Sequence, residues 1–215
     1  MRSLPLLLAA RLLPVAALAT AGWAWTSGPY APTENRPAVA AEPKAAEAEA
    51  EAEAEATYGK PPAPCDVLRS GTVEELVPGA DRGGKELRLT DPGRRRTCSW
   101  SALKGYDYRW LDVGYDVRES AAAARSAYAA RTEGSAEAVA GLGEQAAVLM
   151  ELSEKDGQQS REAKLVVRSH NAVVTVTYNG SDFETQSAPK AETVRDGAER
   201  AARAAVEALG EPRER

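Results

Sequence analysis

The sequence predicts an α+β protein in which a small antiparallel sheet carries helices on one face and one disulfide bond staples the fold. Segments with alternating apolar residues follow one another directly along the chain, which indicates neighbouring antiparallel strands. Segments with helical apolar spacing flank and interrupt them. The chain also has two cysteines, Cys65 and Cys98. The expected order is α-β-β-α-β-β-β-α, with the helices covering one face of the sheet.

The first 30 residues have the composition of a membrane-targeting segment. Arg2 precedes an apolar stretch that runs to Trp25 and is interrupted by Arg11 and Pro14. A basic start followed by an apolar stretch is typical of a signal peptide or signal-anchor. Cleavage near Ala19 would give a secreted protein, whereas an uncleaved segment would be a transmembrane helix that anchors the protein to the cell membrane. We favour either over a buried helix of a cytosolic protein, and both predict an extracytoplasmic location.

Residues 31–63 predict a disordered Pro/Ala/Glu spacer. Glutamate and alanine alternate through residues 47–56, so the segment has no apolar helical face. Like charges at i,i+4, such as Glu47 and Glu51, oppose a helix further. We expect a solvated spacer that does not pack on the domain and lifts it off a membrane. The alternative is an interaction tail for a basic partner.

Residues 64–210 form the predicted extracytoplasmic α+β domain, followed by a disordered tail at 211–215. Residues 65–77 favour short helical segments that end at Pro78-Gly79. Residues 96–100 indicate a short strand. Residues 108–117 alternate strictly, and their odd-numbered set is the more apolar, so that set is expected to face the core.

The second half of the domain continues the pattern. Residues 120–131 are rich in alanine and favour a helix with Ser120 as its N-cap. Residues 144–152 indicate a strand. Two β-branched runs around residues 169–172 predict a hairpin. Residues 189–209 form the last predicted helix. Its apolar stripe comprises Val194, Ala198, Ala201, Ala202, Ala205 and Leu209.

Cys65 and Cys98 are predicted to form a disulfide bond. An even pair of cysteines in an exported chain favours a disulfide because that compartment is oxidising. A tetrahedral zinc site would need further ligands, and the chain has a single histidine, His170. A C-x-x-C redox motif is absent from the sequence. We therefore predict no metal site and no cofactor.

No set of residues indicates catalysis. His170 falls in the predicted hairpin turn, where we expect solvent around it and no carboxylate to orient it. Gly141-Leu142-Gly143 precedes a strand instead of following one, the wrong order for a phosphate-binding loop. The basic triplet Arg94-Arg95-Arg96 favours a solvated loop, with contact to anionic lipid or cell-wall polymers as the alternative. With a formal net charge of −5, the chain is not expected to bind nucleic acid.

Aromatic residues concentrate in the first half of the domain. Packing of strands in the core explains most such residues. The alternative is a ligand groove. Its predicted members are Trp100, Tyr106, Tyr108 and Trp110.

Three short motifs occur in a fixed order along the domain. They are Pro64-Cys65-Asp66-Val67-Leu68, Cys98-Ser99-Trp100 and Gly141-Leu142-Gly143-Glu144-Gln145-Ala146. Together they resemble the P-C-x-x-L, C-x-W and G-L-G-(acidic)-x-A markers of an actinobacterial secreted, lipoprotein-like family of unknown function. The resemblance spans about residues 64–209 and implies an exported α+β domain with a disulfide between the two cysteines. It implies no activity, and the chain lacks the family's lipid-attachment cysteine, which favours a signal-anchor or a free secreted form.

These observations predict a non-enzymatic extracytoplasmic domain that binds an envelope component, a small ligand or a partner protein. An accessory or structural subunit of a membrane complex is the first alternative. A cell-wall hydrolase is the second. A pocket lined by tryptophan and tyrosine would favour binding, an exposed apolar patch would favour the subunit, and converging carboxylates with raised pKa values would favour the hydrolase.

Overall fold

A computed structural model describes residues 56–88 and 91–214 of the chain. The predicted targeting segment, residues 1–30, and spacer residues 31–55 lie outside the described residues. Within the described ranges, no helix combines the length and hydrophobicity needed to cross a membrane.

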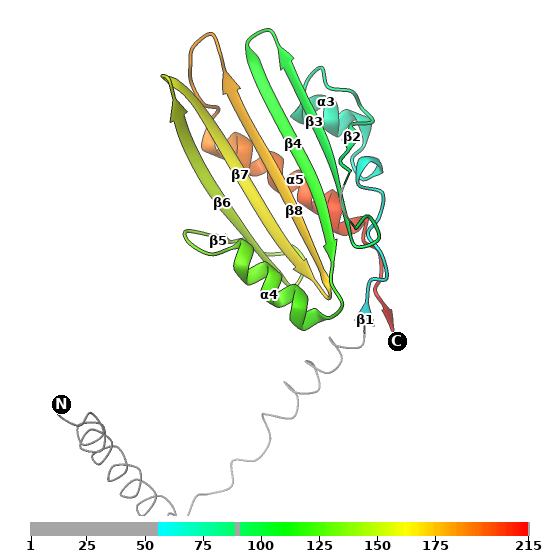
Figure 1. The fold of residues 1–215 in the computed structure, drawn as a ribbon. Coiled ribbons are helices and arrows are strands. Elements are labelled where there is room, and N and C mark those ends of the chain that lie inside the picture. The colour runs from blue at the N-terminus through cyan, green and yellow to red at the C-terminus, as the bar shows by residue number, and fades with distance from the viewer. Residues whose placement is uncertain (1–55, 89–90, 215) are drawn as a thin grey trace, which may run out of the picture. The chain divides into compact units, whose positions relative to one another are not determined.

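A seven-stranded antiparallel sheet forms the centre of the fold, in the order β2-β3-β4-β8-β7-β6-β5 (Figure 1). Short strands β2 (Lys85–Glu86) and β5 (Glu137–Ala138) close its two edges. The long strands are β3 (Arg95–Lys104), β4 (Asp107–Val117), β6 (Gln145–Lys155), β7 (Gln158–Ser169) and β8 (Ala172–Asp182). The last hairpin, β7–β8, returns beside β4, so the sheet consists of the β3–β4 hairpin joined to the β6–β7–β8 meander.

The helical elements of the described residues are the 3₁₀ turn η1 (Pro64–Asp66), α3 (Ser70–Leu76), α4 (Ala121–Arg131) and α5 (Ala191–Glu207). Apart from the two-residue strands, the order is α-β-β-α-β-β-β-α, as predicted. The α+β fold class is therefore confirmed. Ser120 caps α4, since its hydroxyl accepts a hydrogen bond from the Ala123 N–H at 3.1 Å.

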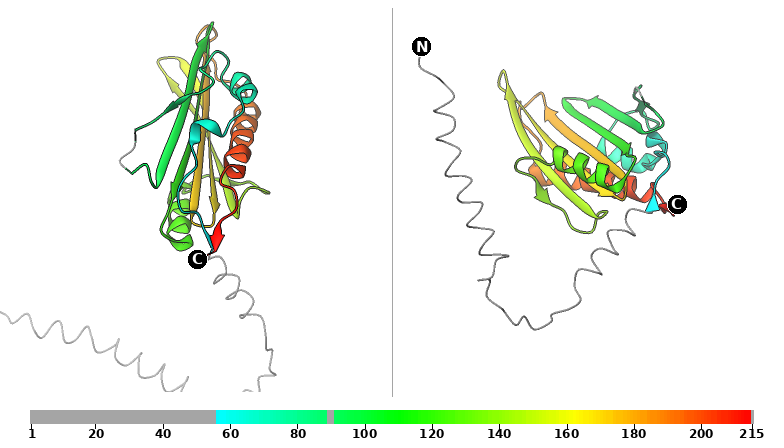
Figure 2. Two further views of the ribbon diagram at one scale, coloured as in Figure 1. Left: turned by 90° about the vertical axis from the view of Figure 1, so that its right-hand side faces the viewer. Right: turned by 60° about the horizontal axis from the view of Figure 1, so that its bottom comes forward.

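The main core lies between the sheet and helices α3 and α5, on what we call the closed face (Figure 2). Leu111, Val113 and Tyr115 of β4 point to this side and are at most 2% exposed, which confirms the predicted facing of the odd-numbered set. The Tyr115 hydroxyl donates to the Ala205 carbonyl of α5 at 2.8 Å, and the Tyr178 hydroxyl donates to the Leu76 carbonyl of α3 at 2.6 Å. These bonds fix both helices to the sheet, and burial raises the pKa of Tyr115.

Helix α4 lies on the opposite side of the sheet from α5, so the expectation that all helices share one face is wrong (Figure 2). Ala124 and Ala127 of α4 pack against Val166 of β7 and Val173 of β8 in a separate apolar cluster. Val166 and Val173 alternate with neighbours that point into the main core, so they face away from it. Their side chains need cover on that side, and α4 supplies it.

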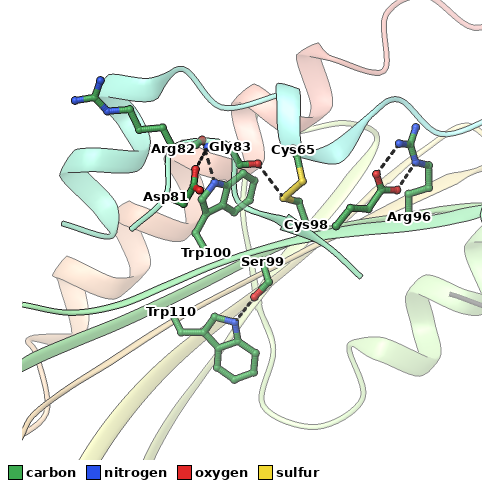
Figure 3. The surroundings of a disulfide bond; sticks show 10 residues. Cys65, Asp81, Arg82, Gly83, Arg96, Cys98, Ser99, Trp100 and Trp110 are labelled. Atoms are coloured by element: carbon green, nitrogen blue, oxygen red, sulfur yellow. Dashed lines mark hydrogen bonds and ion pairs between the residues drawn. A yellow bond between two sulfur atoms is a disulfide. The ribbon is translucent and has the colours of Figure 1, made fainter. Parts of the chain in front are cut away.

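The disulfide between Cys65 and Cys98 joins η1 to β3, with Cα atoms 5.1 Å apart (Figure 3). This confirms the predicted pairing and indicates an oxidising, extracytoplasmic environment. Trp100 packs nearby at 1% exposure and donates from Nε1 to the Arg82 carbonyl at 3.3 Å. Gly84, at φ +60°, passes so close that a Cβ there would lie 2.5 Å from the Trp100 ring, so a glycine is needed.

The folded region extends beyond the predicted limits of 64 and 210. Strand β1 (Ala56–Thr57) pairs with β9 (Arg213–Glu214), so neither segment is the free spacer or tail that we expected. The Tyr58 N–H donates to the Asn171 Oδ1 at 2.7 Å, and Asn171 Nδ2 donates back to the Tyr58 carbonyl at 3.0 Å. With its side chain 9% exposed, Tyr58 ties this segment to the β7–β8 turn.

Candidate functional site

The face of the sheet opposite α5, which we call the open face, is covered by α4 at one end only. Strand alternation assigns its residues. On β4 they are Tyr108, Trp110, Asp112, Gly114 and Asp116. On the neighbouring strand β8, Thr175, Thr177 and Asn179 share this side. Most of these side chains are partly exposed and polar, so the face is suited to contact something other than the protein's own core.

A groove of about 640 Å³ opens at the end of this face away from α4, and we call it the aromatic groove. Three of its lining side chains are aromatic: Tyr108, Trp110 and Phe183. The others are polar or charged. They are Ser153, Lys155, Asp156, Gln158, Ser160, Asn179 and Ser181. Apolar rings beside a few fixed polar groups are typical of small-molecule sites.

Trp110 is held by hydrogen bonds that use its N–H and leave its ring for other contacts. Its Nε1 donates to Ser99 Oγ and to Asp112 Oδ1, each at 2.8 Å. Figure 3 shows its indole on the opposite side of the strands from Trp100 and the disulfide. Because the indole's one donor is already satisfied, a ligand meets Trp110 through apolar ring surface.

Phe183 is positioned by the loop that follows β8. Its N–H donates to the Tyr106 carbonyl at 2.9 Å, and its ring lies 6.2 Å from that of Tyr108, centroid to centroid. The Asp182 carboxylate accepts from the Thr185 N–H at 2.7 Å, the Thr185 hydroxyl at 2.8 Å and the Glu184 N–H at 3.0 Å. These donors, Thr185 first, hold the pKa of Asp182 below its usual value, so the loop is fixed by a charged carboxylate.

The polar lining of the groove divides into fixed and unused groups. Gln158 Nε2 donates to Ser181 Oγ at 2.6 Å, and the hydroxyls of Ser153 and Ser160 lie 2.8 Å apart. By contrast, no hydrogen bond within the described residues engages the side chains of Lys155, Asp156 or Asn179. One cation, one anion and one amide are therefore free to bind a ligand, with no net charge among them.

The structure brings together only part of the predicted groove. Tyr108 and Trp110 line it. Trp100 is buried on the closed face, because the β3–β4 register pairs it with Leu111 instead of Trp110. Tyr106 lies at the tip of the β3–β4 hairpin, 58% exposed and outside the lining. Phe183 was missed by the sequence analysis, and its only signal was an apolar ring in a polar segment after the last strand.

His170 lies in the β7–β8 turn, as predicted, but the expectation that solvent surrounds it is wrong. Its side chain is 25% exposed, its Nε2 lies 3.5 Å from Glu144 Oε1, and its ring packs edge-on against Tyr58 at 5.9 Å. The neighbouring Arg168 is buried and pairs with the same Glu144. The contacts come from segments distant in sequence, so alternation around the turn could not reveal them. They make His170 part of a structural cluster at the end of the sheet opposite the aromatic groove.

The described residues contain no group of three or more histidine, cysteine, aspartate or glutamate side chains placed to hold a metal ion. The aromatic groove offers rings, hydroxyls, two side-chain amides, one lysine and one aspartate. Its nearest carboxyl group with a shifted pKa, Asp182, is shifted downward, whereas a general acid needs a raised value. The arrangement can bind a ligand through stacking and hydrogen bonds.

Comparison with known proteins adds little to this geometry. No protein-family model matches the sequence, and no curated protein matches it. A crystal structure of a protein from Bacteroides thetaiotaomicron VPI-5482 is similar over 61% of this chain, with 11% sequence identity and a TM-score of 0.31. The match spans about half of that protein, 48% of its length. The class of protein is thus defined by its own fold: a disulfide-bonded α+β domain with one closed and one open sheet face.

Proposed function

We propose that this protein is a non-enzymatic extracytoplasmic binding domain whose aromatic groove binds a carbohydrate segment of the cell envelope. One observation carries the proposal: Tyr108, Trp110 and Phe183 present apolar rings beside unused polar groups in one groove. Sugar rings have apolar C–H faces and polar hydroxyl edges. Aromatic rings offer the matching apolar surface, while groups such as Asn179 and Lys155 offer hydrogen bonds.

The position of the groove supports this function. The described chain starts at β1, which Tyr58 ties to the β7–β8 turn. The groove lies at the other end of the sheet, where its lining includes Lys155, Asp156 and Gln158 of the β6–β7 turn. In Figure 1 this turn and β1 lie at opposite ends of the sheet. A domain joined to a membrane or a spacer through its N-terminus would therefore present the groove away from the attachment point. Export by a cleaved signal or a signal-anchor, as the sequence predicts, fits this arrangement equally.

A second function, contact with a partner protein as an accessory subunit of a membrane complex, is favoured by one specific surface. Leu103 and Tyr106 at the β3–β4 tip are each 58% exposed, and Phe183 beside them is 47% exposed. Large apolar side chains exposed together are typical of interaction sites. Tyr106 belongs to this tip and not to the groove, which allows the two functions to be separated.

The test is cosedimentation of the full-length protein, in detergent solution, with purified peptidoglycan sacculi. We expect the wild type to sediment with the sacculi, and Trp110→Ala to weaken binding by about tenfold or more, equivalent to about 1.4 kcal/mol or more. Tyr106→Ala is the matched control and should bind as the wild type does. Unchanged binding by a folded Trp110→Ala protein would refute the proposal. Loss with Tyr106→Ala alone would place the glycan contact at the β3–β4 tip instead of the groove and would also refute the proposal.

A further inference from the structure

A second hollow opens on the same face beneath the C-terminal end of α4, and we call it the arginine hollow. Its volume is about 220 Å³. Its polar lining comes from three adjacent strands and from α4. These residues include Arg95, Thr97, Asp116, Arg131 and Thr175. None of them lines the aromatic groove, and the two hollows lie at opposite ends of the open face.

Gly114 creates the floor of the arginine hollow. In the sheet it lies between Thr97 of β3 and Thr175 of β8, which are its register partners on either side. A Cβ at this position would lie 3.0 Å from Thr97 Oγ1, so a side chain here would fill the gap between the two threonines. Within the described residues, no hydrogen bond engages either hydroxyl, which leaves two O–H groups beside an open floor.

Positive charge surrounds this floor. Asp116 is 6% exposed, and its Oδ2 accepts from Arg131 Nη2 at 2.5 Å while its Oδ1 lies 3.2 Å from Arg118 Nε. Two guanidinium groups therefore compensate one nearly buried carboxylate. Arg95 lies directly across from Asp116 in the β3–β4 register and adds a third positive charge. These four groups carry a net charge of about +2, because arginine stays protonated in proteins.

Arg95 differs from its neighbours in the basic triplet. Arg96 makes a bidentate pair with Glu86 at 2.6 and 2.8 Å, and Arg94 pairs with Glu119 at 3.3 Å. In the described part of the chain, the guanidinium of Arg95 has no such partner, although it lines the hollow. Its planar set of N–H donors is thus available at the position where the hydroxyls of Thr97 and Thr175 are also unused.

We propose that the arginine hollow is an oxyanion-binding site, which takes the phosphate or carboxylate group of a ligand. Guanidinium groups bind both kinds of oxyanion through paired, charge-assisted hydrogen bonds. Arg95 and Arg131 supply the charge, the threonine hydroxyls supply neutral donors, and Gly114 leaves the room. Asp116 keeps Arg131 in place. The single negative charge of Asp116 is outweighed by the three guanidinium groups of Arg95, Arg118 and Arg131.

This site does not depend on the function proposed for the aromatic groove. Gly114 lies four positions after Trp110 on β4, which corresponds to about 13 Å along an extended strand. A single sugar ring in the groove therefore cannot reach the arginine hollow. A failure of glycan binding at Trp110 and a failure of anion binding at Arg95 are separate results.

The test is an NMR titration of the full-length protein at pH 7 with sodium phosphate and, in a second arm, sodium acetate, while sodium chloride keeps the ionic strength constant. We expect saturable shifts of the Thr97, Gly114 and Thr175 amides, with a dissociation constant in the millimolar range that is common for small anions. The arm with the tighter binding identifies the oxyanion class. Failure of both anions to saturate these shifts by about 100 mM would overturn the proposal.

Two matched pairs of variants locate the site. Arg95→Gln should weaken binding by about tenfold, whereas Arg94→Gln removes the same charge one residue away and should leave it within about twofold. Thr175→Val should weaken binding by about threefold, whereas Thr177→Val, on the same strand and face but outside the hollow, should not. Equal weakening by Arg94→Gln and Arg95→Gln would show unspecific attraction to positive charge and would overturn the site. Unchanged amide spectra away from the hollow confirm that each variant is folded.

Discussion

The closed and open faces are the two sides of the same strands, but the closed face packs in the main core and the open face carries the aromatic groove. Trp100 and Trp110 show the difference, since they are the same residue type on adjacent strands of one hairpin. Trp100 is 1% exposed against the disulfide, with its N–H on a backbone carbonyl. Trp110 is partly exposed in the aromatic groove, with its N–H on Ser99 and Asp112. Stability therefore depends mainly on one face, which leaves the other free to carry polar and aromatic groups for binding.

The largest expected effect is on the closed face. Trp100→Ala should lower the free energy of unfolding by about 3–5 kcal/mol, because it leaves a cavity in the core. Trp110→Ala should lower it by about 1–2 kcal/mol, since Trp110 is only partly buried and lies outside the main core. Chemical denaturation of both variants under oxidising conditions measures the difference. Equal losses would show that the two faces do not differ in their contribution to stability.

Removal of the disulfide should have the next largest effect. The Cys65–Cys98 bond spans a sequence separation of 33. The loop-closure entropy it removes from the unfolded chain is worth about 3–4 kcal/mol. The double variant Cys65→Ala/Cys98→Ala should lose about that free energy of unfolding in urea. A wild-type protein whose stability does not change on reduction would contradict this account of the bond.

A smaller effect is expected where α5 meets the sheet. A Cβ at Gly197 would lie 2.5 Å from the Tyr178 ring and 3.1 Å from Leu76, so Gly197→Ala should destabilise the protein by about 1–3 kcal/mol through overpacking. Gly71→Ala, in α3, meets nothing within 4 Å and is the matched control. It should stabilise the protein by about 0.5–1 kcal/mol, because alanine favours a helix. Thermal unfolding distinguishes the two signs.

The smallest effect concerns the loop that positions Phe183 and depends on pH. The pKa of Asp182 is lowered in the folded protein, chiefly by hydrogen bonds from Thr185. The stabilisation that the ionised Asp182 carboxylate gives the folded loop is complete above the usual aspartate pKa of about 3.9. It is lost as the pH falls through the lower pKa of Asp182 in the folded protein. The amide shifts of Glu184 and Thr185 should therefore change only below about pH 3.9. Asp182→Asn should remove that transition, and its persistence in the variant would assign it to another group.

The fold could be predicted from local patterns because its long strands alternate clearly. The side of the sheet on which α4 packs was not predicted, although the sequence contains a sign that both faces of β7 and β8 are covered. Residues 165–167 and 172–174 are continuously apolar, and such runs indicate that both faces of a strand are covered. The Ala-rich α4 has only a weak apolar stripe of its own, so its sequence alone did not show where it packs. Tyr58 was missed for a different reason, since its contacts with Asn171 lie far along the chain.

Part of the aromatic groove could be predicted from the sequence. Tyr108 and Trp110 share a strand, so alternation places them on one face. Trp100 could not be assigned without the β3–β4 register, because a shift by one residue exchanges the faces. The arginine hollow was not predictable, since it depends on Gly114 lying between two threonines from strands that are distant in sequence.

The division between the two faces is tested most directly by one variant that is assayed twice. Trp110→Ala is measured for its free energy of unfolding and for cosedimentation with peptidoglycan sacculi. We predict a folded protein that loses no more than about 2 kcal/mol of stability and whose binding falls by about tenfold or more. A folded Trp110→Ala protein that binds as the wild type does would contradict the assignment of ligand binding to the open face.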